Sequence, residues 1–235
     1  MFENDDANWP YSTEGGTAFV VNARGKFFGI TCKHAFGSFN WRQIIITDKK
    51  HGRQIAGLNS IYYPTEPINS SVGSDIMDVV AISFNDDVGA AFFQDSAYIV
   101  DPETVGSSSK NDQLFVYGAL RDSSTIGNSD IAPNFALLEF ADFGPYTPDP
   151  VLRTAKAKFE NPEFSNLNGI SGSPVFNYTS RKLCGMAIRG GMNKNAADLY
   201  YVDFSDINEL LFAIINGTLR TSYAKTIAQP NLLPK

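Results

Sequence analysis

A serine flanked by glycines is the first group in this chain that could act as a nucleophile. Ser171 lies in the segment Gly169-Ile170-Ser171-Gly172-Ser173-Pro174. Glycines on both sides allow a tight turn in which successive backbone amides point into one small concavity. A serine hydroxyl attacks a carbonyl carbon only when a base takes its proton and hydrogen-bond donors stabilise the developing oxyanion. The turn could supply these donors, and the base must come from elsewhere in the chain.

Two histidines, His34 and His51, are available as that base. His34 follows the apolar segment Gly29-Ile30-Thr31-Cys32, which has the pattern of a strand. His51 lies in the polar run 48–53, which is typical of an exposed turn. We therefore interpret His34 as the candidate base.

A carboxylate that could orient the imidazole stands at the head of another apolar run. Asp78 directly precedes Val79-Val80-Ala81-Ile82, which is typical of a buried strand. Asp75 is a rival, but it lies in a Gly-Ser-Asp loop and no strand follows it directly. The order along the chain is then His34, Asp78 and Ser171.

Each of these motifs has a simpler structural interpretation when it is taken alone. Glycine and serine gather in ordinary turns, a histidine after a strand often only packs, and an aspartate before a strand is often a turn residue. The combination, with separations of 44 and 93 residues, favours a catalytic interpretation. Those intervals leave room for most of one small barrel and then for most of a second.

The three residues and their surroundings resemble the chymotrypsin-like serine proteases, whose triad runs in this order. The resemblance covers roughly residues 15–215 and implies an all-β fold. That fold consists of two antiparallel six-stranded β-barrels, with the active site between them, and a C-terminal helix. The matching segments are Thr31-x-x-His34 after a strand, Asp78-Val79-Val80-Ala81-Ile82, the Ser171 motif and, more weakly, Gly16-Thr17-Ala18-Phe19-Val20-Val21.

The resemblance implies a serine endopeptidase that works through an acyl-enzyme intermediate. His34 would take the proton of Ser171, Asp78 would hold the imidazole tautomer, and the backbone amides of Gly169 and Ser171 would form the oxyanion hole. Because the floor of the primary pocket at Ser165 is neutral, we expect cleavage after a small or uncharged apolar residue. The same register gives the expected substrate-binding residues, which are Ser165, Asn166, Ala187, Ile188, Arg189 and Gly190.

Three positions depart from the family pattern. Ile170 stands where zymogen-activated members carry an aspartate that pairs with a newly cut N-terminus, so we do not expect that activation route. Ile188 stands where a serine often supports the aspartate of the triad, and Cys32 replaces a small alanine near the histidine. The departures at Ile170 and Ile188 keep open a second function, a catalytically silent protease-like module that binds a peptide or a partner protein. A protease dedicated to a single partner is a third.

Signatures of other chemistry are not found in the sequence. The elbow of an α/β-hydrolase needs a glycine two residues after the nucleophile, where this chain has Ser173. Two histidines and two cysteines, widely separated, do not have the spacing of metal ligands, and a glycine-rich phosphate loop is missing. We therefore expect no metal and no other cofactor.

Composition supports a globular enzyme without identifying which one. A chain of 235 residues, 43% of them hydrophobic, can bury one substantial core or two small ones. The net charge of −6 argues against nucleic acid or an anionic membrane as the main partner. The acidic N-terminus does not have the pattern of a signal peptide, and no apolar run is long enough to span a membrane.

The two cysteines, Cys32 and Cys184, fall in different predicted barrels, so we expect reduced thiols in a cytoplasmic protein. Secretion after the removal of a leader stays open, and the sequence does not indicate an oligomeric state.

Apolar alternation and turn signals predict strands nearly throughout the chain. Residues 205–216 instead have helical periodicity, with Ser205 as the expected N-cap and Gly217 as the stop. An N-terminal barrel is expected in residues 1–105, with strands at 17–22, 26–32, 43–47, 53–62 and 78–84. After a linker-like segment at 101–112, a C-terminal barrel is expected in residues 106–235, with strands at 114–118, 135–140, 152–159, 174–176, 183–188 and 199–202.

Overall fold

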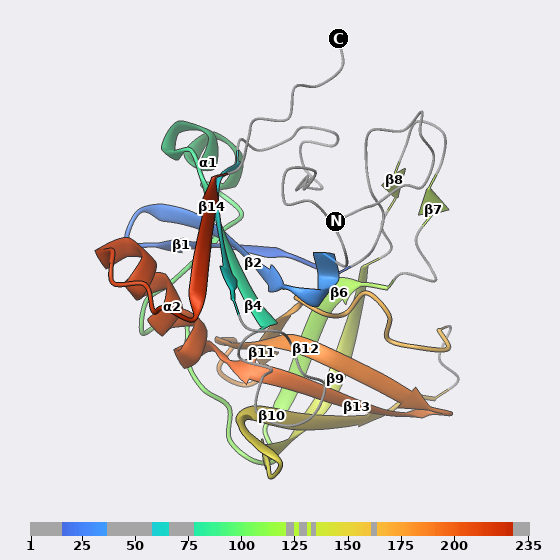
Figure 1. The fold of residues 1–235 in the computed structure, drawn as a ribbon. Coiled ribbons are helices and arrows are strands. Elements are labelled where there is room, and N and C mark those ends of the chain that lie inside the picture. Colours follow the sequence, from blue (N-terminus) through green and yellow to red (C-terminus); the bar gives the residue numbers. More distant parts are fainter. Residues whose placement is uncertain are drawn as a thin grey trace.

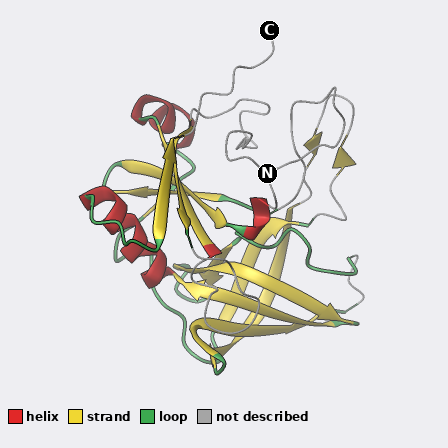
Figure 2. Ribbon diagram, in the orientation of Figure 1, coloured by secondary structure: helices red, strands yellow, loops and turns green. Residues whose placement is uncertain are grey.

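The computed structural model describes residues 16–36, 58–65, 78–120, 125–126, 131–132, 135–160 and 164–227. These residues form two assemblies of strands, with one longer helix packed beside them (Figures 1 and 2). The expected mostly-β fold with a C-terminal helix is confirmed. The strand expected at 43–47, the first part of the strand expected at 53–62, His51 and Asp75 lie outside the described residues.

The first assembly, the N-terminal sheet, has six strands in the order β14-β3-β4-β2-β1-β5. Its neighbours pair antiparallel except for β1 and β5, which are parallel. The predicted hairpin joins β1 to β2 through Arg24 and Gly25, which both have positive φ, as a tight two-residue hairpin turn requires. The strands are β1 (Phe19–Ala23), β2 (Lys26–Cys32), β3 (Leu58–Pro64), β4 (Val79–Phe84), β5 (Tyr98–Ile99) and β14 (Tyr223–Ile227).

The second assembly is a closed antiparallel barrel in the order β10-β13-β12-β11-β6-β9. Two of its strands, β9 and β12, extend well beyond the predicted ranges because their later residues lack a continuous apolar run. Those of β9 alternate between exposed and buried, and those of β12 are half-buried or exposed. The strands are β6 (Gln113–Ala119), β9 (Phe135–Tyr146), β10 (Asp149–Lys158), β11 (Pro174–Asn177), β12 (Leu183–Asn193) and β13 (Ala196–Asp203). The short strands β7 (Thr125–Ile126) and β8 (Ile131–Ala132) pair with each other.

The longer helix, α2 (Phe204–Asn216), has its N-cap two residues before the predicted one. Asp203 is the N-cap, and its side chain accepts a hydrogen bond from the backbone N of Ser205 at 3.1 Å, so the cap expected at Ser205 was wrong. Gly217 ends the helix with φ 69°, as predicted. Two further helices were not predicted, the short η1 (His34–Phe36) and α1 (Asp86–Phe93). Within the described ranges, none of the helices is both long and apolar enough to cross a membrane.

One apolar core joins the two assemblies. It contains Val21 and Ile30 from the N-terminal sheet, Met186 and Val202 from the barrel, and Leu211 from α2, all of them fully buried. Because α2 packs against both β12 and β13, it closes one side of this shared core (Figure 1). The end of β2 is therefore held against the barrel, and this contact forms the candidate site.

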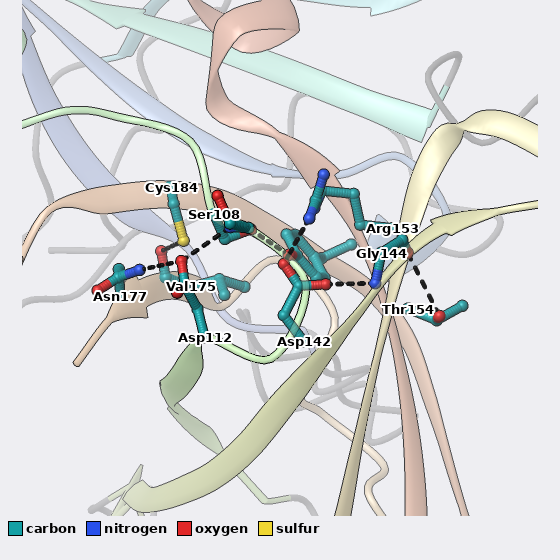
Figure 3. A network of polar contacts seen from close by, with 11 residues as sticks. Ser108, Asp112, Asp142, Gly144, Arg153, Thr154, Val175, Asn177 and Cys184 are labelled. Atoms are coloured by element: carbon teal, nitrogen blue, oxygen red, sulfur yellow. Dashed lines mark hydrogen bonds and ion pairs between the residues drawn. The ribbon is translucent and has the colours of Figure 1, made fainter. Parts of the chain in front are cut away.

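A buried ionic network fixes the inside of the barrel (Figure 3). Asp142 is completely buried, and its carboxylate accepts hydrogen bonds from Arg153 at 2.5 Å, from Tyr201 at 3.0 Å and from the backbone N of Gly144 at 2.6 Å. Burial lowers the pKa of Arg153, but the hydrogen bonds and charges of Asp142 and Tyr201 outweigh it and hold that pKa above its ordinary value. Ser108, at 2.5 Å from the Tyr201 hydroxyl, ties the segment that enters the barrel to this network.

Candidate active site

Pairing between two adjacent strands brings His34 and Asp78 together. β2 ends at Cys32, which is paired with Val79 at the start of β4, so His34 and Asp78 emerge at the same end of the N-terminal sheet. One carboxylate oxygen of Asp78 hydrogen-bonds Nδ1 of His34, and the other accepts the backbone N of His34 at 2.9 Å. The backbone of Asp78 also accepts the N of Lys33 at 2.6 Å.

The two side chains differ strongly in exposure. The side chain of Asp78 is 1% exposed and that of His34 is 43% exposed. A buried carboxylate held by two donors orients the imidazole, and it favours the tautomer with the proton on Nδ1. Nε2 is then the nitrogen that can accept a proton from an incoming hydroxyl.

Asp78 has a neighbour that sequence reasoning missed. Tyr223, the first residue of β14, donates its hydroxyl to the backbone O of Val79 at 3.3 Å. Burial, together with the negative charge of Asp78, raises the pKa of Tyr223. The period-two pattern of residues 223–227 was a usable strand signal, although it is short and lies beyond the helix.

Ile188 is at a β-bulge in β12. Ala187 pairs with Tyr201 and Arg189 pairs with Tyr200, so Ile188 is the extra residue between them. Its side chain is 2% exposed and belongs to the core that joins the two assemblies. This position therefore contributes packing to the site and supplies no hydroxyl to Asp78.

Two glycines with positive φ shape the turn that carries Ser171. Gly169 has φ 94° and Gly172 has φ 82°. A Cβ atom on Gly172 would lie 2.0 Å from the backbone O of Thr17, so a larger residue would push the turn away from the N-terminal sheet. Ser171 itself is half-buried.

The amides of this turn fall into two sets. Those of Ile170, Gly172 and Ser173 donate to backbone oxygens at 3.1, 2.8 and 3.0 Å. In contrast, the amides of Gly169 and Ser171 donate no hydrogen bond to any residue in the described ranges. Two nearby amides that the fold itself leaves unused are what the binding of an oxyanion requires.

Thr17 holds the turn from the side of the N-terminal sheet. Its backbone N donates to the O of Ser171 at 2.7 Å, and its hydroxyl donates to the O of Gly169 at 3.0 Å. The same hydroxyl accepts the backbone N of Ala119 at 2.9 Å. The backbone O of Thr17 in turn accepts the hydroxyl of Thr31 at 2.7 Å, which links the turn to β2. In the sequence, Thr17 was noted only as part of an apolar strand.

A single carbonyl also connects the two halves of the site. The backbone O of Ala187 accepts the amide of Gly172 at 2.8 Å and the thiol of Cys32 at 3.4 Å. Cys32 lies two residues before His34, and Gly172 directly follows Ser171. The seam between the N-terminal sheet and the barrel therefore brings the segments of His34 and Ser171 to the same place.

The predicted substrate-binding residues lie on the loop before Ser171 and on β12. Ser165 is exposed and Asn166 is half-buried, and Asn166 accepts the backbone N of Asn168 at 2.8 Å. Of the β12 residues, Ala187 and Ile188 are buried, which leaves Arg189 and Gly190 as the half-buried pair.

One edge of β12 has no described strand paired with it at residues 190–193, beside these residues. β11 pairs with β12 only as far as Met186, and residues 189–193 pair on their other side with β13. A Cβ atom on Gly191 would meet nothing within 4 Å. In the described part of the chain, this edge has the geometry that accepts an extended peptide as an added strand.

Comparison with known proteins identifies the fold of this chain but does not assign it to a family. No protein-family model matches the sequence, and no curated protein sequence matches it. Among solved structures, human heparin binding protein has a TM-score of 0.54 and 12% sequence identity, over 85% of this chain and 90% of that chain. A mutant of the same protein has a TM-score of 0.56 at 12% identity, over 92% of this chain and 95% of that chain.

A Glu endopeptidase in complex with MPD also matches, with a TM-score of 0.49 and 13% identity, over 91% of this chain and 99% of that chain. The neighbours have the fold of chymotrypsin-like serine proteases, and this chain has that fold.

Proposed function

We propose that this protein is a serine endopeptidase that uses His34, Asp78 and Ser171. The observation that carries the proposal is the contact of buried Asp78 with both Nδ1 and the backbone N of His34, at the seam where the Ser171 turn meets β2. This arrangement supplies an oriented base at the place where the turn supplies a nucleophile and two unused amides.

In the proposed reaction, Nε2 of His34 takes the proton of Ser171 as its oxygen bonds to the carbonyl carbon of a peptide. Asp78 stabilises the imidazolium that results. The amides of Gly169 and Ser171 donate to the oxyanion of the tetrahedral intermediate. His34 then returns the proton to the leaving amine, which leaves Ser171 acylated until water repeats the sequence.

The proposed substrate is an extended polypeptide that pairs with β12 at residues 190–193, along the edge that no described strand covers. The residue before the scissile bond would lie near Ser165, Asn166 and Gly190. None of these side chains carries a charge, which supports a preference for a small or uncharged apolar residue there. Arg189 is held over the ring of Tyr200, 4.8 Å from its centroid, which directs its charge along β13.

The second candidate function is a binding module with this fold. One neighbour is named for binding heparin, so the fold by itself does not imply proteolysis. Heparin is a polyanion, and the net charge of −6 on this chain opposes such a ligand. A silent module would bind a peptide along β12 without cleaving it.

Cleavage of a peptide library, analysed by mass spectrometry, tests the proposal. We expect cleavage by the wild-type protein and a loss of at least about 10⁴-fold in Ser171→Ala and His34→Ala. Ser173→Ala is the matched control, because the hydroxyl of Ser173 is buried in the same turn and has no hydrogen-bond partner among the described residues. This variant should cleave like wild type. Peptide binding without cleavage by the wild-type protein would instead support the binding module.

A further inference from the structure

Three side chains that can bind a metal ion lie close together at His34. Cys32 Sγ, a ring nitrogen of His34 and a carboxylate oxygen of Asp78 all lie within 4.8 Å of one another. We propose that the Cys32-His34-Asp78 cluster is a binding site for a zinc-class divalent ion, and that the ion inhibits the enzyme. The inhibition rests on the function proposed above, whereas the binding does not.

The chemistry of the three donors fits zinc. Thiolate, imidazole and carboxylate are the ligands of Zn²⁺ in proteins, and three of them leave one tetrahedral position for water. The sulfur also disfavours Mg²⁺ and Ca²⁺, which take oxygen ligands. Tetrahedral coordination places ligand atoms roughly 3.3–3.8 Å apart, so the longest separation in the cluster must shorten by about 1 Å and the hydrogen-bonded atoms of His34 and Asp78 must move apart. His34 can make this movement because it is the one exposed side chain of the three.

The cluster depends on the fold and not on local spacing. Cys32 and His34 are near each other in sequence, but Asp78 follows His34 by 44 residues. Pairing of Cys32 with Val79 brings the third ligand into place. The sequence-based expectation of no metal site rested on the separation of the histidines and cysteines, and it did not include this carboxylate.

Binding would change the protons of two ligands. The thiol of Cys32 loses its proton to solvent as the sulfur–metal bond forms. The backbone O of Ala187 then loses one donor, but it keeps the amide of Gly172 at 2.8 Å. The metal takes the lone pair of Nδ1 on His34, so the ring proton moves to Nε2.

This change of tautomer is the reason for inhibition. With a proton already on Nε2, His34 cannot accept the proton of Ser171. Asp78 is also withdrawn from its role, because its oxygen now bonds the metal. Serine attack therefore stops without any change in Ser171 itself.

Cys184 provides a matched control for the thiol. It is the other free cysteine, it is also fully buried, and its thiol donates to the backbone O of Val175 at 3.3 Å. Among the described residues, Cys184 belongs to no comparable group of three ligands.

Titration of the full-length protein with Co²⁺, followed by absorption spectroscopy, tests the site. Wild type and Cys184→Ala should develop the thiolate-to-cobalt charge-transfer band and saturate at about one equivalent, as a single site requires. Cys32→Ala and Cys32→Ser should lack the band while keeping the circular dichroism of the wild type. Two substitutions are used so that failure of one to fold does not decide the result. In parallel, labelling of Ser171 by a fluorophosphonate should require at least about tenfold more Zn²⁺ for inhibition in Cys32→Ala.

The outcomes distinguish metal binding at this cluster from the proposed enzymatic activity of Ser171. No cobalt band in wild type, or an equal band in Cys32→Ala, would overturn the site. A band that depends on Cys32 in a protein that never reacts with the fluorophosphonate would support the site and contradict the enzyme. A band that depends on Cys32, with labelling that Zn²⁺ does not change, would overturn the inhibition.

Discussion

Asp78 and Thr17 each position one part of the candidate site by hydrogen bonds, Asp78 on the side of His34 and Thr17 on the side of Ser171. Asp78 fixes the imidazole through two hydrogen bonds to His34. Thr17 fixes the carbonyls of Gly169 and Ser171, which lie on the turn that carries the nucleophile. The carboxylate of Asp78 already accepts two hydrogen bonds from His34. Position 188, where the resembled family often has a serine beside the aspartate, can therefore be occupied by Ile188, which packs in the core.

Replacing Thr17 by valine tests the positioning role of its hydroxyl. The change keeps the shape of the side chain but removes the donor to the O of Gly169 and leaves the amide of Ala119 without its acceptor. The carbonyl of Gly169 is then no longer held, so the backbone of Gly169 can shift, and its amide, which belongs to the preceding peptide group, loses its alignment. We expect kcat to fall about 10–100-fold with little change in KM, because the oxyanion exists only after attack.

Steady-state kinetics of Thr17→Val and Thr17→Ser provide the measurement. Thr17→Ser keeps the hydroxyl and should recover most of kcat. A rise in KM with unchanged kcat, or equal losses in both variants, would show that Thr17 contributes only packing.

At the scale of elements, the interior of the barrel contains a buried polar network beside its apolar core. Arg153 on β10, Asp142 on β9 and Tyr201 on β13 connect three strands through one carboxylate (Figure 3). Only polar residues at separated positions contribute, so no local pattern in the sequence indicated the network. One of these strands, β13, pairs with β12.

Breaking this network should cost far more than breaking a surface pair. Arg153→Leu leaves the Asp142 carboxylate buried without its charged partner, which we expect to lower the free energy of unfolding by about 3–5 kcal/mol. Lys156→Ala, on the same strand as Arg153, breaks the exposed pair that Lys156 makes with Asp198 of β13, which should cost less than about 1 kcal/mol. Denaturant unfolding of both variants measures the difference, and similar costs would show that the buried network is not a main source of stability.

At the scale of the whole molecule, the chain returns to its first sheet after it has built the barrel. β14 pairs with β3 over residues 223–227, next to Asp78. The two assemblies are therefore joined at their shared core, by α2 and by this last strand. The site at their seam depends on all three connections.

The parts that the sequence could predict are those with strong local signals. Strands β1, β2 and β4 and the stop of α2 at Gly217 follow from apolar runs and a glycine. The contact of His34 with Asp78 follows from their positions at strand ends, once β2 and β4 are known to pair. Thr17, Tyr223 and the role of Cys32 depend on residues that meet only in the tertiary structure. Their sequence surroundings resemble ordinary strands, so local reasoning could not find them.

Removal of β14 tests the dependence of the site on the last strand. Ending the chain after Ser222 removes the strand that covers β3 and the hydroxyl bound to Val79. We expect at least about a tenfold loss in the rate of peptide cleavage and a lower thermal midpoint, because Asp78 then lies beside an uncovered sheet edge. A chain that ends after Ile227 keeps β14 and is the control. Equal activity of the two shortened chains would show that β14 is dispensable for the site.

The most direct test of the account is reaction of the purified protein with a fluorophosphonate probe, followed by mass-spectrometric mapping of the labelled residue. The account predicts a single adduct on Ser171 that is lost in both Ser171→Ala and His34→Ala and kept in Ser173→Ala. Labelling that persists in Ser171→Ala, or a wild-type protein that does not react, would contradict the assignment of Ser171 as an activated nucleophile.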